Sequence, residues 1–95
     1  MKKSKVVYVI TENWYQYHNL GGYSALIKSD NGTHVFNKIE DAINEVKDAM
    51  AESVKNGESS FDTIEENDYS ACYIQKDFDK LGIKRKFIID ELKVI

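Results

Sequence analysis

Apolar residues follow strand periodicity over most of the chain and helix periodicity over one segment. Residues 5–12 (KVVYVITE) are β-branched or aromatic and apolar on both alternating faces, which predicts a central strand. Residues 22–28 (GYSALIK) predict a second strand after a glycine-containing loop. Asn31-Gly32 is a type I′ turn signal, so we expect a short third strand from Thr33 to Phe36.

The clearest predicted element is a helix from about Lys38 to Lys55. Its apolar positions recur every three or four residues and form one stripe of Ile39, Ile43, Val46, Met50 and Val54. Asn37 is the expected N-cap, and Gly57 fits the C′ position, where a left-handed conformation is common. We expect the stripe to pack on a sheet.

The last third of the chain predicts two more strands, at residues 69–75 and 86–95. Residues 57–69 are expected to form a polar loop, and Asp77 and Gly82 could bound one helical turn between the strands. The predicted order is β-β-β-α-β-β in a single domain, residues 1–95. The expected fold is therefore an α+β two-layer domain, a mainly antiparallel sheet of about five strands with one long helix on one face.

Composition narrows the class of function. With 95 residues, 42% of them hydrophobic, the chain can bury a core but has little volume left for a deep active site. We therefore expect a non-catalytic binding protein without a cofactor. The single cysteine, Cys72, excludes an intramolecular disulfide, and the apolar run after the N-terminal lysines is too short for a signal peptide or membrane span. We expect a cytosolic protein with no membrane contact.

Four neighbouring residues, Trp14, Tyr15, Tyr17 and His18, form the main candidate contact site. They fall in a predicted loop after the first strand. Tryptophan and tyrosine are enriched in protein interfaces, so the loop could be an exposed recognition patch. Ordinary packing of a hairpin explains the same residues equally well, and both interpretations stay open.

A second candidate contact site is an acidic arc on the predicted helix, opposite the apolar stripe: Asp41, Glu45, Asp48 and Glu52. Like charges four residues apart destabilise a helix by a few tenths of a kcal/mol, so the arc could reflect selection for an acidic surface. Charged outer faces are also normal for solvated helices.

Two alternatives belong to other classes of function. A nucleic-acid module would use Lys80, Lys84, Arg85 and Lys86 with the sheet aromatics Tyr8, Tyr73 and Phe87. The net charge of −3 and the absence of a nucleic-acid-binding signature count against it. A small enzyme or ligand binder would use His18, His34 or Cys72, although no metal-binding or catalytic spacing joins them.

The stretch KVVYVITENWY and the helix entry FNKIEDAI resemble short uncharacterised bacterial and phage proteins that begin with a VYVxT strand. The similarity covers about residues 5–50 and concerns structural motifs. It implies no catalytic or cofactor-binding residue. By analogy of class, small acidic phage and mobile-element proteins often inhibit host or defence machinery, which suggests an accessory or inhibitor role.

The leading hypothesis is a binding module that contacts another protein through the aromatic loop and the acidic helix face. We also expect a homodimer, formed by the aromatic loop or by pairing of the C-terminal strand, since no proline blunts an exposed sheet edge.

Overall fold

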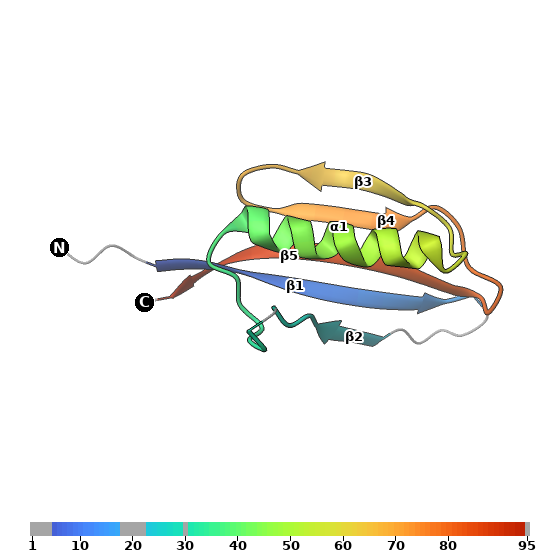
Figure 1. The fold of residues 1–95 in the computed structure, drawn as a ribbon, viewed down its shortest axis with the longest axis horizontal. Coiled ribbons are helices and arrows are strands. Elements are labelled where there is room, and N and C mark those ends of the chain that lie inside the picture. Colours follow the sequence, from blue (N-terminus) through green and yellow to red (C-terminus); the bar gives the residue numbers. More distant parts are fainter. Residues whose placement is uncertain (1–4, 18–22, 30, 95) are drawn as a thin grey trace.

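The computed structural model describes residues 5–17, 23–29 and 31–94. One antiparallel five-stranded sheet, in the order β2-β1-β5-β4-β3, carries a single helix on one face (Figure 1). The elements are β1 (Lys5–Gln16), β2 (Tyr23–Leu26), α1 (Ile39–Lys55), β3 (Phe61–Glu66), β4 (Ala71–Gln75) and β5 (Ile83–Val94). The α+β two-layer fold is confirmed. Within the described residues, no helix has the length and apolar character needed to cross a membrane.

The two longest strands, β1 and β5, form the centre of the sheet. They pair along their whole length, from Lys5 opposite Val94 to Gln16 opposite Ile83. The C-terminal strand therefore lies between β1 and β4 and is not an outer strand of the sheet, although β4 pairs only with its residues 86–89. Its run of apolar residues on both faces, Phe87 to Ile89, is typical of a central strand.

The order of elements is β-β-α-β-β-β, which differs from the predicted order in two places. Thr33–Phe36 is not a regular strand, because only Phe36 bridges to the sheet, opposite Tyr8. The expected polar loop at 57–69 contains β3, which pairs with β4. β3 is an edge strand that leaves most of its side chains exposed, so it lacks the apolar alternation that marks a strand in a sequence.

The turn before the helix also differs from the prediction. Gly32 donates to the Ser29 carbonyl at 2.9 Å, and Ser29 donates to the Thr33 carbonyl at 2.7 Å. Gly32 has a φ of 79°, whereas no described non-glycine residue has a positive φ. A type I′ turn needs positive φ at both central positions, so that assignment is wrong.

The predicted cap of α1 is wrong at the N-terminus of the helix and correct at its C-terminus. The helix begins at Ile39, and the N-cap position is Lys38, which makes no side-chain capping bond, so Asn37 is not the cap. At the other end Gly57 has a φ of 92° and donates to the Val54 carbonyl at 3.0 Å. The predicted C′ role of Gly57 is therefore confirmed.

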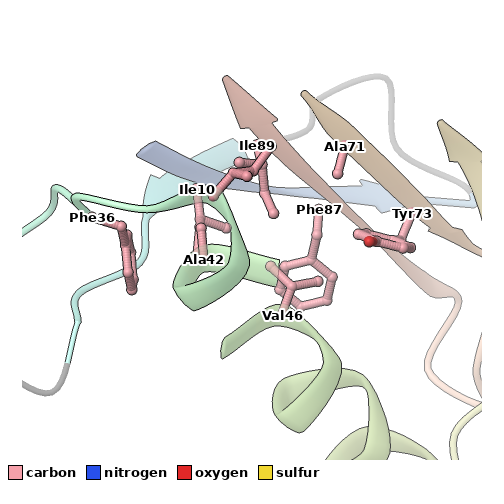
Figure 2. Close-up of a cluster of buried hydrophobic side chains, with 9 residues drawn as sticks. Ile10, Phe36, Ala42, Val46, Ala71, Tyr73, Phe87 and Ile89 are labelled. Atoms are coloured by element: carbon pink, nitrogen blue, oxygen red, sulfur yellow. The ribbon is translucent and has the colours of Figure 1, made fainter. Parts of the chain in front are cut away.

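The core lies between α1 and the sheet (Figure 2). Ala42 and Val46 of the helix meet sheet residues including Ile10, Phe87 and Ile89, all of them buried. Ile43 and Met50 are partly buried against this cluster, as the predicted stripe requires. The stripe fails at its last position. Val54 is exposed, whereas Ser53 is buried and its hydroxyl accepts a hydrogen bond from Gln75 Nε2 at 3.4 Å.

Candidate functional site

The aromatic residues near the end of β1 divide between the two faces of the sheet. Trp14 lies opposite Arg85 and Tyr15 opposite Lys84, so both residues belong to β1 and not to a loop. Strand alternation directs Trp14 to the helix-covered face, with Ile10 and Glu12, and Tyr15 to the other face. We call this second face, which α1 does not cover, the open face. Trp14 is half-buried and Tyr15 is exposed.

The prediction of a loop failed because β1 continues through these residues with partners on both sides. Trp14 pairs with Tyr23 of β2 as well as with β5. Tyr17 comes directly after the strand, and its N–H donates to the Gly82 carbonyl at 2.8 Å. His18 lies outside the described residues.

Exposed apolar side chains gather where β1 ends and β5 begins. We call Tyr15, Tyr17, Phe78 and Leu81 the tip cluster. The rings of Tyr17 and Phe78 meet edge to face, with centroids 5.3 Å apart, and Lys84 Nζ lies 5.5 Å from the Phe78 centroid. Tyr17 is 64% and Leu81 is 83% exposed, and Tyr15 and Phe78 are exposed as well. An edge-to-face pair is favourable, so the two rings stabilise each other's positions.

The connection that carries Phe78 and Leu81 is held by Asp79. Asp79 Oδ1 accepts from the Leu81 N–H at 2.9 Å and from the Ile83 N–H at 2.8 Å. Gly82 closes the bend by donating to the Asp79 carbonyl at 3.0 Å, with a φ of 78°. The expected helical turn between Asp77 and Gly82 is therefore wrong. Asp79 satisfies the backbone N–H groups of a tight bend, an arrangement typical of aspartate in turns.

Gly82 also lies beside Tyr17. A Cβ atom at this position would lie 3.4 Å from Tyr17 Cβ. The distance is that of an ordinary contact, so it is the positive φ of 78° that favours glycine here. Hydrogen bonds join Tyr17, just after β1, to Gly82, and Asp79 to Ile83 of β5, so they hold the backbone that carries the tip cluster. The end of β1 and the connection between β4 and β5 meet at one end of the sheet (Figure 1).

The side chain of Arg85, the single arginine, lies on the helix-covered face of the sheet, opposite the open face. Its Nε donates to Glu12 Oε2 at 2.7 Å, its Nη1 lies 3.8 Å from Glu58 Oε1, and its guanidinium stacks 5.2 Å from the Phe87 centroid. Gln75 accepts from the Arg85 backbone N–H at 2.9 Å. This arginine is bound within the fold. It is separated from Lys84 and Lys86, which alternation directs to the open face.

The residues proposed to bind nucleic acid therefore do not share one surface. Lys80 is exposed, and Lys84 and Lys86 are partly exposed. Tyr73 and Phe87 are buried in the core, where a base cannot stack on them. The exposed rings next to Lys84 are those of Tyr15 and Phe78 in the tip cluster. Neither ring was among the sheet aromatics expected to stack on bases.

The acidic residues of α1 lie away from the tip cluster. Asp41, Glu45 and Asp48 line an open hollow of about 550 Å³ between the helix and the segment 29–37. Asp41 and Asp48 are exposed and Glu45 is half-buried, while Glu52 is exposed but does not line the hollow. The aromatic and acidic candidate sites are two separate surfaces.

The residues of the enzyme alternative do not form a site within the described residues. Cys72 is half-buried, and burial, only partly offset by Lys86, raises the pKa of its thiol. The thiol is thus not activated as a nucleophile. His34 is exposed, and no three histidine, cysteine, aspartate or glutamate side chains in the described part of the chain come together to hold a metal ion.

Sequence reasoning missed Phe78, Leu81 and Glu12. Phe78 and Leu81 are isolated apolar residues in a polar connection, and an isolated exposed apolar residue is too common to mark a site. Glu12 left a clearer signal, as an acidic residue on the core face of a strand that is otherwise largely apolar. Such a residue requires a buried partner.

Comparisons with models of protein families, with curated proteins and with solved structures find no match to this chain.

Proposed function

We propose that this chain is a protein-binding module that holds its partner at the tip cluster. The observation that carries the proposal is the gathering of Tyr15, Tyr17, Phe78 and Leu81, all exposed, at one end of the sheet. Single exposed apolar residues need no explanation, but several exposed apolar residues at one end of a sheet, with two aromatic rings in contact, are typical of protein contact sites. Leu81 is among the most exposed large side chains described and has no evident role in the stability of the fold.

The contacts that hold the tip cluster in place support the same proposal. Asp79 fixes the bend, and the Tyr17–Phe78 contact limits the motion of both rings. A surface that is ordered before binding loses less conformational entropy when a partner docks. Lys80 and Lys84 border the patch, and they favour a partner that presents acidic side chains around an apolar centre.

A quantitative pull-down in the organism that encodes the chain tests this proposal. The double variant Tyr17→Ala with Leu81→Ser should lose a specific protein partner by about tenfold or more, since it removes two central contact residues. The matched control is Tyr69→Ala with Ile64→Ser, which changes exposed residues of β3 and the β3–β4 turn. Equal capture by the two double variants would contradict the proposal.

One observation favours the nucleic-acid alternative: Lys84 and Lys86 share the open face with Tyr15. A basic surface with exposed rings is one way to bind single strands. The engagement of Arg85 with Glu12 weighs against it, because arginine is the usual reader of phosphate. Binding of a labelled oligonucleotide that weakens steeply with salt, and that Lys84→Ala reduces, would favour this alternative.

A further inference from the structure

A stretch of β5 has a strand partner on one side only. β4 pairs with β5 from Ile74 opposite Lys86 to Ala71 opposite Ile89. The residues that precede Ala71 belong to the turn from β3 and form no pair with β5. β1 pairs with β5 as far as Val94. Within the described residues, Asp90–Val94 therefore has β1 on one side and no strand on the other, beyond the end of β4 (Figure 1). We call this stretch the free edge.

The hydrogen-bonding direction at the free edge follows from the alternation of the strand. The Arg85 N–H donates toward β4, to the Gln75 side chain. Odd-numbered residues of β5 thus direct their N–H and C=O groups to the β4 side, and even-numbered residues direct theirs to β1. β1 agrees, because Tyr8 exchanges hydrogen bonds with Phe36 on its outer side, leaving odd-numbered β1 residues to bond β5. Glu91 and Lys93 therefore present unpaired main-chain groups at the free edge.

We propose that a second copy of this chain pairs antiparallel at the free edge, about a two-fold axis that passes between the two Leu92 residues. Glu91 then lies opposite Lys93 of the second copy, and the axis repeats that pair. Each such pair exchanges two main-chain hydrogen bonds and places opposite charges side by side on the same face of the sheet. The sequence of the free edge is self-complementary in this register.

The apolar residues of the free edge fit the same arrangement. Leu92 is 47% exposed, and Val94 is exposed as well. The two Leu92 side chains would meet as a non-hydrogen-bonded pair, in which cross-strand side chains are closest. Pairing would bury both of them on the open face.

The other sheet edges are less suited to self-pairing. β3 has a bulge between Thr63 and Glu65, and a bulge disrupts the regular ladder that a partner strand needs. β2 is only four residues long. The free edge lies at the end of the sheet away from the tip cluster, so a dimer would leave both tip clusters accessible (Figure 1).

Sedimentation equilibrium of the full chain, from about 1 µM to about 1 mM, tests the pairing. Lys93→Glu sets Glu91 against a second glutamate, and Glu91→Lys sets Lys93 against a second lysine. Each single variant should raise the dissociation constant of the dimer about tenfold or more. An equimolar mixture of the two should form a heterodimer with an affinity near that of the parent, because both opposite-charge pairs return. Lys28→Glu, the same charge change at an exposed position elsewhere, should dimerise like the parent.

A parent chain that is monomeric over this range, or single variants that dimerise like the parent, would overturn the proposal. So would a mixture that gains no affinity over the single variants. Lys93→Pro tests the main-chain bonds directly, since it removes an N–H that points away from β1. It should abolish dimerisation and keep the unfolding midpoint of the monomer. A Lys93→Pro chain that still dimerises would overturn pairing at this edge.

Discussion

Arg85 reaches diagonally from β5 to Glu12 on β1, and its Nε donates to Glu12 Oε2 at 2.7 Å. Glu12 is buried, and Arg85 also approaches Glu58, in the segment that follows α1. The ion pair therefore connects the two central strands and the segment after the helix. A buried charge of this kind is tolerated only with a partner. The guanidinium of the single arginine therefore stabilises the fold, and its contacts within the chain leave it unsuited to bind a ligand at the surface.

Arg85→Ala should destabilise the protein by about 3–5 kcal/mol, because it leaves Glu12 as an uncompensated buried carboxylate. The free energy of unfolding in urea measures this. Lys84→Ala, the neighbouring change on the open face, should cost less than about 1 kcal/mol. Arg85→Met with Glu12→Leu should recover much of the loss. Similar stabilities for the Arg85→Ala and Lys84→Ala variants would contradict the structural role of the ion pair.

Val46→Asp should destabilise the protein by several kcal/mol, since Val46 is 1% exposed and the change places a charge in the core. Asp48→Ala, two residues further along the exposed side of the same helix, should change stability by less than about 0.5 kcal/mol. Thermal unfolding by circular dichroism compares the two variants. If Val46→Asp melts like the parent, the helix does not pack on the sheet in this orientation.

The sequence predicts elements well where one face is strongly apolar, and poorly where burial is slight or depends on distant partners. The stripe around Val46 correctly placed α1 against the sheet. β3 could not be predicted because its pairing with β4 buries few of its side chains. The tip cluster depends on contacts between residues far apart in sequence, Tyr17 with Phe78 and Gly82. No local pattern records such contacts, so only half of the cluster, Tyr15 and Tyr17, was among the candidates.

Tyr73 should make stability fall at alkaline pH. Burial raises the pKa of Tyr73 above the ordinary value of 10.0, and so does the Glu66 carboxylate, which accepts a hydrogen bond from the Tyr73 hydroxyl. The folded chain keeps this proton while the unfolded chain loses it, so the stabilisation is complete below pH 10 and declines as the pH rises above it. The loss approaches about 1.4 kcal/mol per pH unit for one proton.

Urea unfolding at a series of pH values from about 8 to about 11.5 measures this decline. Tyr73→Phe should cost about 1 kcal/mol at neutral pH and should make the alkaline decline shallower. Some decline should remain, because burial and Glu91 raise the pKa of Tyr8 as well. An alkaline profile that Tyr73→Phe leaves unchanged in slope would contradict the assignment.

Trp14 and Tyr17 should respond differently to truncation, although they are close in sequence. Trp14 lies on the helix-covered face and is half-buried, so Trp14→Ala should cost about 2–4 kcal/mol. Tyr17→Ala should cost about 1 kcal/mol or less, because its ring is mostly exposed. Denaturation curves separate the two. Emission of Trp14, the only tryptophan, should be intermediate between a wet and a buried indole and only partly quenched by iodide. Equal losses of stability would contradict the division of these aromatics between two faces.

Site-specific photocrosslinking tests the central claim, that the tip cluster is a protein contact surface, most directly. A photoreactive benzoylphenylalanine replaces Leu81 in one variant and Ile64 in another, since both residues are exposed but only Leu81 belongs to the tip cluster. After irradiation in the cells that encode the chain, mass spectrometry identifies what is attached at each position. The proposal predicts a discrete protein adduct from position 81 that is absent from position 64. Adducts with nucleic acid alone at position 81, or the same proteins at both positions, would contradict it.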